Sequence, residues 1–386
     1  MFDKKQFDLL HQFQNSETPC VSIYIPTYRA GNVQEDRIRF KNAISDATNQ
    51  LTDASIFPEK EMTKAKAIEF LSPAISLLEN ETLWSELSDG LAIFVGENHF
   101  SYFVVPIDLP QTVYVHNYFY LRHLLPMLKD EKRFFVLALS QNEVRFFEGN
   151  RKSITPVIIN DLIPNGMEEM VGTDDNSQNL QSRGSTSNMV LYHGHGGGKD
   201  DKNESLKKYF RSVDDGLMEM LHDEDAPMVI YSVDYQIPIY QEISNYSNIH
   251  HNHITGNPEN DDPVLIHERA WSVVNDYFIQ KNETTKNEFN QHLADGKASF
   301  SIHDITPAAV QGKVETLFLD SGLVHEWGSF DEKNFKIQIH KTRQPDSICL
   351  LDKTAISTFQ NGGDVFIRPR VEMPRVVSHL NAVFRF

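Results

Sequence analysis

The sequence predicts an α/β protein made of three layered domains. Short β-rich runs alternate with amphipathic helical runs along the 386 residues, a pattern typical of sheets covered by helices. This length accommodates two or three domains of ordinary size. Two polar stretches, at 172–203 and 246–262, interrupt the alternation. We therefore expect an N-terminal α/β domain at 1–130, a middle domain at 131–258 and a C-terminal α/β domain at 259–386.

The first domain should contain one sheet with two covering helices. An alternating β-rich run at 20–25 predicts a strand that Pro26 ends. Residues 33–52 have a helical repeat whose apolar members are expected on one face: Ile38, Ala43, Ile44, Ala47 and Leu51. The remaining elements are expected as a helix at 60–78 and strands at 90–95, 101–106 and 112–115.

The middle domain should begin with a β-hairpin. Two β-rich runs, at 134–139 and 143–147, flank the polar turn Ser140-Gln141-Asn142. Further on, residues 204–221 repeat apolar side chains every three or four positions, which predicts an amphipathic helix. The expected buried face comprises Leu206, Phe210, Val213, Leu217 and Leu221. An apolar run at 227–231 predicts a buried strand, and the polar stretch at 246–262 is interpreted as a linker.

The third domain should again alternate helices and strands. Helical patterns cover three stretches, at 264–282, 285–294 and 350–360. Strand patterns cover four stretches, at 314–319, 335–340, 364–368 and 382–386.

Charge and composition exclude some classes of function. The net charge of −18 argues against a protein that coats nucleic acid, since phosphate contacts need clustered Lys and Arg. Cys20 and Cys349 lie far apart and fit neither a disulfide framework nor a zinc site, so we expect small buried side chains. No apolar run approaches membrane-spanning length, and the N-terminus lacks a signal-peptide core. We expect a soluble cytoplasmic protein that contacts neither membrane nor DNA.

The most informative motif is a glycine run at 192–199, Tyr-His-Gly-His-Gly-Gly-Gly-Lys. Four glycines within five residues give a backbone that either moves freely or approaches another molecule closely. Together with the polar residues before it, the run forms a loop of roughly thirty residues, and loops of that length are mostly functional or disordered. We expect the loop at 172–203 to carry the function.

The glycine run does not fit a nucleotide phosphate loop. That motif requires a glycine at position 193 and a Ser or Thr after Lys199, whereas this chain has His193 and Asp200. No cofactor is expected. A metal site is another interpretation of the glycine run, because His193 and His195 could bind a metal ion together with Asp200 or Asp201. No third ligand is identifiable, so His193 and His195 are expected to be exposed histidines and no metal ligand is assigned. Three later histidines, His250, His251 and His253, are also expected to be solvated.

A group of cations follows the glycines: Lys199, Lys202, Lys207, Lys208 and Arg211. An equal number of nearby acids balances them: Asp200, Asp201, Glu204, Asp214 and Asp215. Most of these residues are expected on a solvated helix face. Lys207, Lys208 and Arg211 share one edge and could contact backbone phosphates. No Ser-His-Asp or Cys-His arrangement is apparent from the sequence.

The order of these features resembles the archaeal and eukaryotic class-I peptide release factors, their relative Pelota and, more closely, the related bacterial proteins. That family's middle domain is RNase H-like and carries a mobile loop with the pattern His-Gly-x-Gly-Gly-Gln. Here His193-Gly194-His195-Gly196-Gly197 match the pattern, and Gly198 stands where glutamine is expected. The helical pattern at 204–221 follows in the expected place.

Both ends of the chain support the resemblance. The run at 308–318, Ala-Ala-Val-Gln-Gly-Lys-Val-Glu-Thr-Leu-Phe, resembles the third domain of these proteins, which shares the fold of kink-turn-binding ribosomal proteins. The runs at 361–365, 373–374 and 382–386 fit the same bacterial relatives, as does 21–26.

The resemblance implies a ribosome-associated factor acting in rescue, hibernation or stress. The implied partners are the ribosome, peptidyl-tRNA and a GTPase. Gly196, Gly197 and Gly198 would occupy the catalytic position in the peptidyl-transferase centre. The implied RNA contacts come from His193, His195, Lys199, Lys207, Lys208 and Arg211. Gly198 keeps the backbone N–H and lacks the glutamine side chain, and losing one positioned group commonly costs two to three powers of ten in rate, which argues against efficient hydrolysis.

Two alternatives remain at this stage. The first is a non-catalytic module whose third domain binds folded RNA or a protein. The second is a metal-dependent hydrolase that uses His193, His195 and nearby acids. The codon-reading motifs of true release factors have no counterpart here, so stop-codon decoding is not expected.

Overall fold

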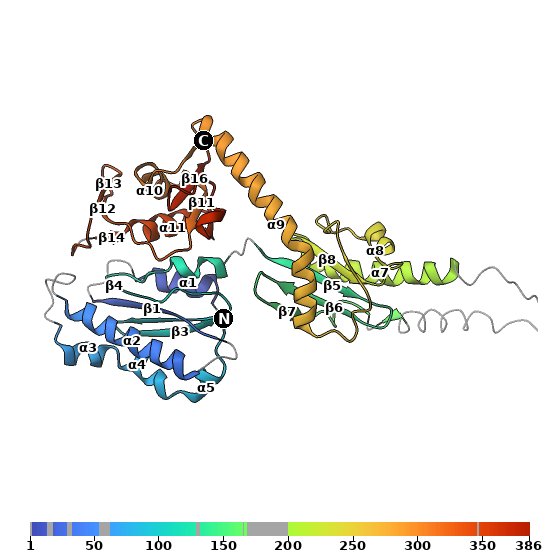
Figure 1. Ribbon diagram of the computed structural model, residues 1–386, viewed down its shortest axis with the longest axis horizontal. Coiled ribbons are helices and arrows are strands. Elements are labelled where there is room, and N and C mark those ends of the chain that lie inside the picture. The colour runs from blue at the N-terminus through green and yellow to red at the C-terminus, as the bar shows by residue number, and fades with distance from the viewer. Residues whose placement is uncertain are drawn as a thin grey trace, which may run out of the picture. The chain divides into compact units, whose positions relative to one another are not determined.

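The computed structural model describes residues 2–13, 18–28, 33–53, 62–128, 132–164, 166–167, 200–345 and 347–386 (Figure 1). These residues form two compact units. Unit 1 combines an N-terminal segment, 1–131, with a C-terminal segment, 282–386, and unit 2 comprises 132–281. Helices and sheets alternate in both units, which confirms the predicted α/β class. The three domain boundaries stay predictions, and the structure counts 259–281 with unit 2.

The N-terminal segment contains an antiparallel sheet with the order β3-β2-β1-β4. Its strands are β1 (Cys20–Pro26), β2 (Gly90–Gly96), β3 (His99–Val105) and β4 (Thr112–His116). Because side chains alternate along a strand, Val21 and Ile23 face one core while Cys20 and Tyr24 face another. The central strands β1 and β2 are therefore buried on both faces.

One face of this sheet is covered by α2 (Val33–Thr52) and a series of short helices. The bounds of α2 confirm the sequence prediction, but Ile38 was wrongly placed on its buried face and is 53% exposed. Phe40 is buried instead. At 100° per residue, Phe40 lies in line with Ala43, Ala47 and Leu51, whereas Ile38 points to the opposite side.

The single helix expected at 60–78 is broken in the structure. The described residues form α3 (Lys64–Phe70), α4 (Ser72–Ser76) and η1 (Leu77–Glu79), followed by α5 (Glu81–Ser85). Pro73 lies in the first turn of α4, where its missing N–H costs nothing, and it ends the preceding helix. The side chain of Asn80 then caps α5 by accepting from Leu83 N at 3.1 Å.

The C-terminal segment contains a mixed sheet with the order β10-β16-β11-β15. Its strands are β10 (Ala298–Ser299), β11 (Val314–Asp320), β15 (Asp364–Arg368) and β16 (Leu380–Phe384). The helices are α10 (Ile302–Val310), α11 (Leu350–Gln360) and η3 (Arg370–Glu372). A smaller antiparallel sheet joins β12 (Trp327–Asp331), β13 (Lys336–Ile339) and β14 (Ile348–Cys349). The strand and helix patterns at 314–319, 350–360 and 364–368 are confirmed.

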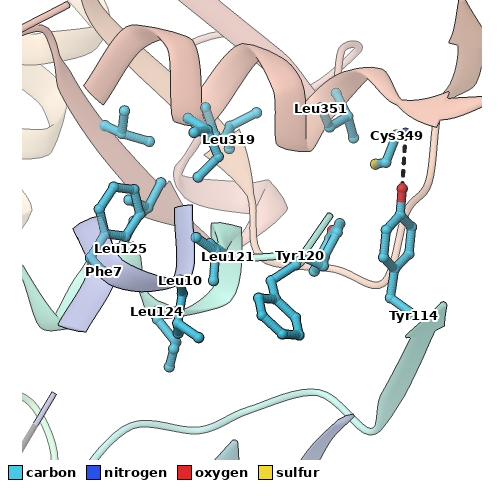
Figure 2. Packing of buried hydrophobic residues seen from close by; sticks show 14 of the residues in the cluster. Phe7, Leu10, Tyr114, Tyr120, Leu121, Leu124, Leu125, Leu319, Cys349 and Leu351 are labelled. Carbon is cyan, nitrogen blue, oxygen red and sulfur yellow. Dashed lines mark hydrogen bonds between the residues drawn. The ribbon is translucent and has the colours of Figure 1, made fainter. Parts of the chain in front are cut away.

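The two segments of unit 1 share one hydrophobic core. From the N-terminal segment, α1 (Lys4–His11) and η2 (Arg122–Met127) pack against α11 and β11. Figure 2 shows Leu121, Leu124 and Leu125 facing Leu319 and Leu351, with Phe7 beside them. Both cysteines are buried thiols at this core, as expected. Burying these side chains removes much apolar surface from water, so the two segments should be hard to separate.

Unit 2 is built on a sheet with the order β7-β6-β5-β8-β9. The strands are β5 (Phe134–Leu139), β6 (Val144–Gly149), β7 (Ile154–Val157), β8 (Met228–Ser232) and β9 (Ile254–Thr255). The β5–β6 hairpin is confirmed, and β8 and β9 run parallel to β5. The helices α7 (Asp200–Leu221) and α8 (Ile237–Ile243) pack on one face, and α9 (Pro263–Ala294) packs on the other (Figure 1).

Two expectations for this part of the chain are wrong. The helices expected at 264–282 and 285–294 form one continuous α9, because no proline or glycine interrupts residues 264–294. The supposed linker at 246–262 folds back onto the sheet as β9, and its His250 is only 3% exposed rather than solvated. His251 and His253 are exposed, as expected. In the part of the chain that the structure describes, no helix combines the length and apolar character needed to cross a bilayer.

Candidate functional site

The glycine segment expected to carry the function lies outside the described residues. This applies to His193, His195, Gly196, Gly197, Gly198 and Lys199. The structure does describe the two stretches of chain that flank it, residues 166–167 and helix α7. The geometry of these two stretches defines the base of the candidate site.

The incoming end of the segment is fixed to the β5–β6 turn. Met167 N donates to Gln141 O at 2.9 Å. Gly166 has a φ of +146°, and a Cβ at this position would lie 2.8 Å from Asn142 O, so only glycine fits against the turn. The close approach therefore requires the glycine that precedes Met167.

The hydroxyl group of Ser140 organises the β5–β6 turn through hydrogen bonds. Ser140 Oγ accepts from Asn142 N at 3.1 Å and Glu143 N at 3.0 Å, and it donates to Glu259 Oε1 at 2.7 Å. Asn142 Nδ2 also donates to Glu259 Oε1, at 2.9 Å. These hydrogen bonds, with the one from Ser140 first, lower the pKa of Glu259 because they favour its charged form. The turn is thus tied to the chain that precedes α9.

The outgoing end of the segment leads into α7, which is held firmly on the sheet. Its predicted apolar face is confirmed: Leu206, Phe210, Val213, Leu217 and Leu221 are all buried. Gly216 allows the helix to approach a neighbouring turn, because a Cβ there would lie 2.1 Å from Leu162 O. Any larger residue would push the helix away from Leu162 and Ile163.

A buried carboxylate locks α7 to α8. Asp214 is 1% exposed, and its oxygens accept from Tyr240 Oη at 3.0 Å, Ser244 Oγ at 2.5 Å and Asn245 N at 2.8 Å. Asn245 Nδ2 adds a fourth bond at 3.1 Å. Four donors offset the desolvation of the carboxylate, so the group specifies one position of the helix rather than destabilising it. Burial, together with Asp214, raises the pKa of Tyr240 well above its usual value, which keeps the hydroxyl protonated as a donor.

The three basic residues assigned to RNA contacts lie on one edge of α7. Lys208 and Arg211 are exposed, whereas Lys207 Nζ forms an ion pair with Glu242 Oε2 of α8 at 3.0 Å. By helical spacing, Glu204 and Asp215 share this edge. The edge therefore carries both signs of charge. The RNA-binding role of Lys207, Lys208 and Arg211 stays a prediction.

A network that the sequence did not reveal holds the chain between β9 and α9. Tyr231 Oη donates to Asp261 Oδ2 at 2.5 Å, and Arg269 Nη1 donates to the same oxygen at 2.7 Å. Arg145 Nη1 donates to Asp261 O at 3.0 Å. These residues lie on four separate stretches of sequence, so no local pattern identifies them. They fix the return of the chain onto the sheet.

Among the residues that the structure describes, no three His, Cys, Asp or Glu side chains are grouped so that they could hold a metal ion. The side chains on which the metal alternative rests, those of His193, His195, Asp200 and Asp201, lie outside the described part. The central strands of unit 2, with the sequences FFVLAL and MVIYS, contain no carboxylate. The described part of unit 2 thus presents contacts that hold the chain at both ends of the segment.

Comparison with protein families gives a match within unit 2. Residues 134–276 match the family model described as "Bacterial archaeo-eukaryotic release factor family 7". The chain is a relative of the archaeo-eukaryotic release factors. The match covers less than half of the chain, and it falls entirely within unit 2. It includes the glycine segment and both of its flanking anchors.

Solved structures similar to this chain include archaeal and yeast proteins. The archaeal termination factor aRF1 is 14% identical, with 99% of this chain and 96% of that chain covered and a TM-score of 0.23. Ribosome-bound archaeal Pelota is 12% identical, with 74% and 72% covered and a TM-score of 0.37. Dom34 from S. cerevisiae is 12% identical, with 75% and 74% covered and a TM-score of 0.36. No curated protein matched the chain.

Proposed function

We propose that this chain is a release-factor-like translation factor that acts on the ribosome in the cytoplasm, in rescue, hibernation or stress. In this proposal the glycine segment at 193–198 enters the peptidyl-transferase centre. The observation that carries the proposal is the family match over 134–276, which spans the run His193-Gly194-His195-Gly196-Gly197. The GTPase partner is proposed on the family relationship alone.

The anchors in unit 2 support a role as the base of an arm. The segment begins at a turn held by Gly166, Met167 and Ser140, and it ends at a helix held by Asp214 and Gly216. A reaching segment needs a rigid base, because its tip must be placed within a fraction of an ångström to act. The strand order β7-β6-β5-β8-β9, with parallel β5, β8 and β9, also supports the proposed RNase H-like fold of this unit.

The proposed factor binds the ribosome and hydrolyses peptidyl-tRNA poorly. Gly198 supplies a backbone N–H for a developing oxyanion but no side chain to shape the pocket. Glycine also has more conformational freedom than glutamine, so the N–H is less well positioned. Gly196 and Gly197 retain the close backbone approach. We therefore propose that the segment occupies the catalytic centre without supplying full catalysis.

A peptidyl-tRNA release assay on stalled ribosomes tests the proposal. The expected result is slow release by the natural chain and release that is about 100-fold faster for Gly198→Gln. Gly194→Gln is the matched control, since it adds the same side chain at a position where the family pattern has glycine. Equal release by both variants would show that position 198 has no special role.

Charge reversal on α7 tests the RNA contact separately. Arg211→Glu is expected to weaken ribosome binding and to reduce its dependence on salt, because one phosphate contact is lost. Arg151→Glu is the matched control, since Arg151 is an exposed arginine of the same unit on the β6–β7 turn. If both variants bind as the natural chain does, the edge of α7 makes no phosphate contact.

A further inference from the structure

The seam between the two segments of unit 1 contains a polar centre beside its apolar core. Asp352, in the first turn of α11, accepts from Leu121 N at 3.2 Å and Arg122 N at 2.9 Å. A carboxylate from one segment thereby caps the η2 helix of the other segment. The two bonding partners lie about 230 residues apart in sequence. Their position at the seam makes the charge state of this centre relevant to how the segments hold together.

Two guanidinium groups are embedded in the same centre. Arg122 is 1% exposed, its Nη2 donates to Val324 O at 3.3 Å, and its Cζ lies 5.5 Å from the centre of the Tyr120 ring. Arg343 lies over two rings, 4.7 Å from Trp327 and 5.4 Å from Tyr114. It also donates to Val115 O across the seam. Both cations are permanently charged at any pH of interest.

Three imidazole rings surround these cations. His123 lies 5.1 Å and His325 lies 5.7 Å from the Tyr120 ring, and His116 Nε2 lies 3.1 Å from Ser347 O. Each ring has one buried nitrogen without a partner in the described part of the chain: His116 Nδ1, His123 Nε2 and His325 Nδ1. A second proton on His123 or His325 would add a buried charge with no acceptor among the described residues. The Asn117 side chain and Ser347 O favour the charged form of His116, but burial outweighs them.

The other charged or titratable groups around the rings are Tyr24 on β1, Asp53 after α2, Tyr114 on β4, Tyr118, Tyr120, Asp320 on β11, His340, Cys349 on β14, and Asp352 and Lys353 on α11. Asp320 favours the charged form of Arg122, and Asp53 favours that of Arg343. Neither carboxylate shifts the pKa of the three imidazole rings. Burial raises the pKa of Tyr114, Tyr118, Tyr120 and Cys349, so these groups stay neutral. Asp352 is the carboxylate bonded within the centre, and its acceptor oxygen already serves two backbone N–H groups.

We propose that this seam is an acid-sensitive joint, in which protonation of His116, His123 and His325 beside Arg122 and Arg343 separates the N-terminal and C-terminal segments of unit 1. The chemical signal is the proton itself. The apolar core holds the joint closed at neutral pH, when the three rings are uncharged. In acid, up to three new positive charges on the imidazoles join those of Arg122 and Arg343 at the seam.

The directions of the pKa shifts agree with this geometry. Burial, and after it Arg343, lowers the pKa of His116 to about 4. Burial, and after it Arg122, lowers the pKa of His325 to about 4. Burial and Arg122 also lower the pKa of His123 well below 6.5. A lowered histidine pKa means that stability present above pH 6.5 is lost as the pH falls toward 4. Burial raises the pKa of Asp352 to about 7, so opening the joint releases one proton from this group above pH 4.

The net number of protons taken up on opening sets how steeply the ratio of open to closed joint depends on pH. Opening takes up as many as three protons on the histidines and releases one from Asp352, which leaves a net uptake of two. The ratio of open to closed joint should then rise about 100-fold for each unit of pH between roughly 6 and 5.

The three tryptophans provide a direct test, because each reports on a different part of the chain. A full-length Trp84→Phe/Trp271→Phe variant retains Trp327, which stacks on His325 at the seam. A Trp84→Phe/Trp327→Phe variant retains Trp271 on α9 in unit 2. As the pH falls from 7.5 to 4.5, the Trp327 emission should shift to the red and become accessible to acrylamide, while Trp271 does not change. If Trp327 stays unchanged, or changes together with Trp271, there is no acid-sensitive joint.

Replacing one imidazole tests the assignment to histidine. His325→Gln, in the background that retains Trp327, should reduce the net uptake from two protons to one, so the response falls to about 10-fold per pH unit. His303→Gln is the matched control, because His303 is an exposed histidine on α10 of the same unit. A His325→Gln titration as steep as that of the control overturns the proposal, whatever the midpoint.

Discussion

Unit 1 and unit 2 bury charge in different ways. In unit 2, the carboxylate of Asp214 receives four hydrogen bonds from α8 and the residues after it, so its charge is fully satisfied. In unit 1, Arg122 and Arg343 are embedded with three neutral imidazoles, several of whose polar atoms lack partners among the described residues. A satisfied buried charge rigidifies a structure, whereas an unsatisfied cluster depends on the protonation state. Unit 2 is therefore suited to be a fixed base, and unit 1 is suited to respond to conditions.

The largest expected effect is a loss of stability in unit 2 that leaves the stability of unit 1 unchanged. In Gly216→Ala the new Cβ would lie 2.1 Å from Leu162 O, so the backbone must move. We expect unit 2 to lose about 3 kcal/mol of unfolding free energy. Urea unfolding followed by Trp271 measures this loss, and Trp84 in unit 1 is the internal control. Ser212→Ala on the same helix should cost far less, and a similar loss in both variants would contradict the close packing of α7.

The next effect removes the buried carboxylate of unit 2. Asp214→Ala leaves Tyr240 Oη, Ser244 Oγ and Asn245 N without their acceptor. We expect a loss of about 2 kcal/mol, because buried donors are left unsatisfied. Asp215→Ala, the exposed neighbour, is the matched control. Equal unfolding midpoints for the two variants would show that Asp214 does not lock α7 to α8.

The sharpest pH comparison concerns Asp352 in unit 1. Its folded pKa, raised to about 7, means that the stability it contributes is present at low pH and is lost as the pH rises toward 7. Asp352→Asn removes this dependence while keeping an acceptor oxygen for η2. Relative to the natural chain, the variant should gain up to about 1.4 kcal/mol per pH unit between pH 5 and 7 and gain nothing further above pH 8. Urea unfolding followed by Trp84 measures the difference, and a constant difference across this range would contradict a raised pKa.

The smallest expected effect lies on the surface of α7. Glu242→Gln removes the ion pair with Lys207, which should cost about 0.5 kcal/mol or less in unit 2. The same change leaves one more uncompensated positive charge on the edge that we assign to RNA. Ribosome binding should therefore become slightly tighter at low salt, as measured by co-sedimentation. Weaker binding would indicate that Glu242 itself contacts the partner.

The sequence predicted the elements with strong local patterns and missed those set by contacts between distant residues. The bounds of α2 and the buried face of α7 follow from apolar spacing alone. Ile38 was assigned to the wrong face of α2, because it is apolar but lies on the side of the helix opposite Phe40. The pairing of Asp352 with the η2 backbone and the Tyr231–Asp261–Arg269 network join residues that no local window contains together. The two helices predicted at 264–282 and 285–294 are the single helix α9 in the structure.

The candidate site was predictable to a different extent. The glycine run and its following helix pointed to the relationship with release factors, which the match over 134–276 supports. The anchors of the segment were not predictable. Gly166 and Gly216 are needed because of backbone oxygens contributed by Asn142 and Leu162, and these contacts exist only in the folded chain.

The measurement that tests the central claim most directly is crosslinking from the glycine segment to the ribosome. A photoreactive amino acid at position 195 of the full-length chain, bound to stalled ribosomes, should crosslink to ribosomal RNA of the peptidyl-transferase centre. The same group at Arg151, on the β6–β7 turn of unit 2, should not crosslink there. If the protein sediments with ribosomes but position 195 crosslinks elsewhere or not at all, the segment does not enter the catalytic centre and the proposed function is wrong.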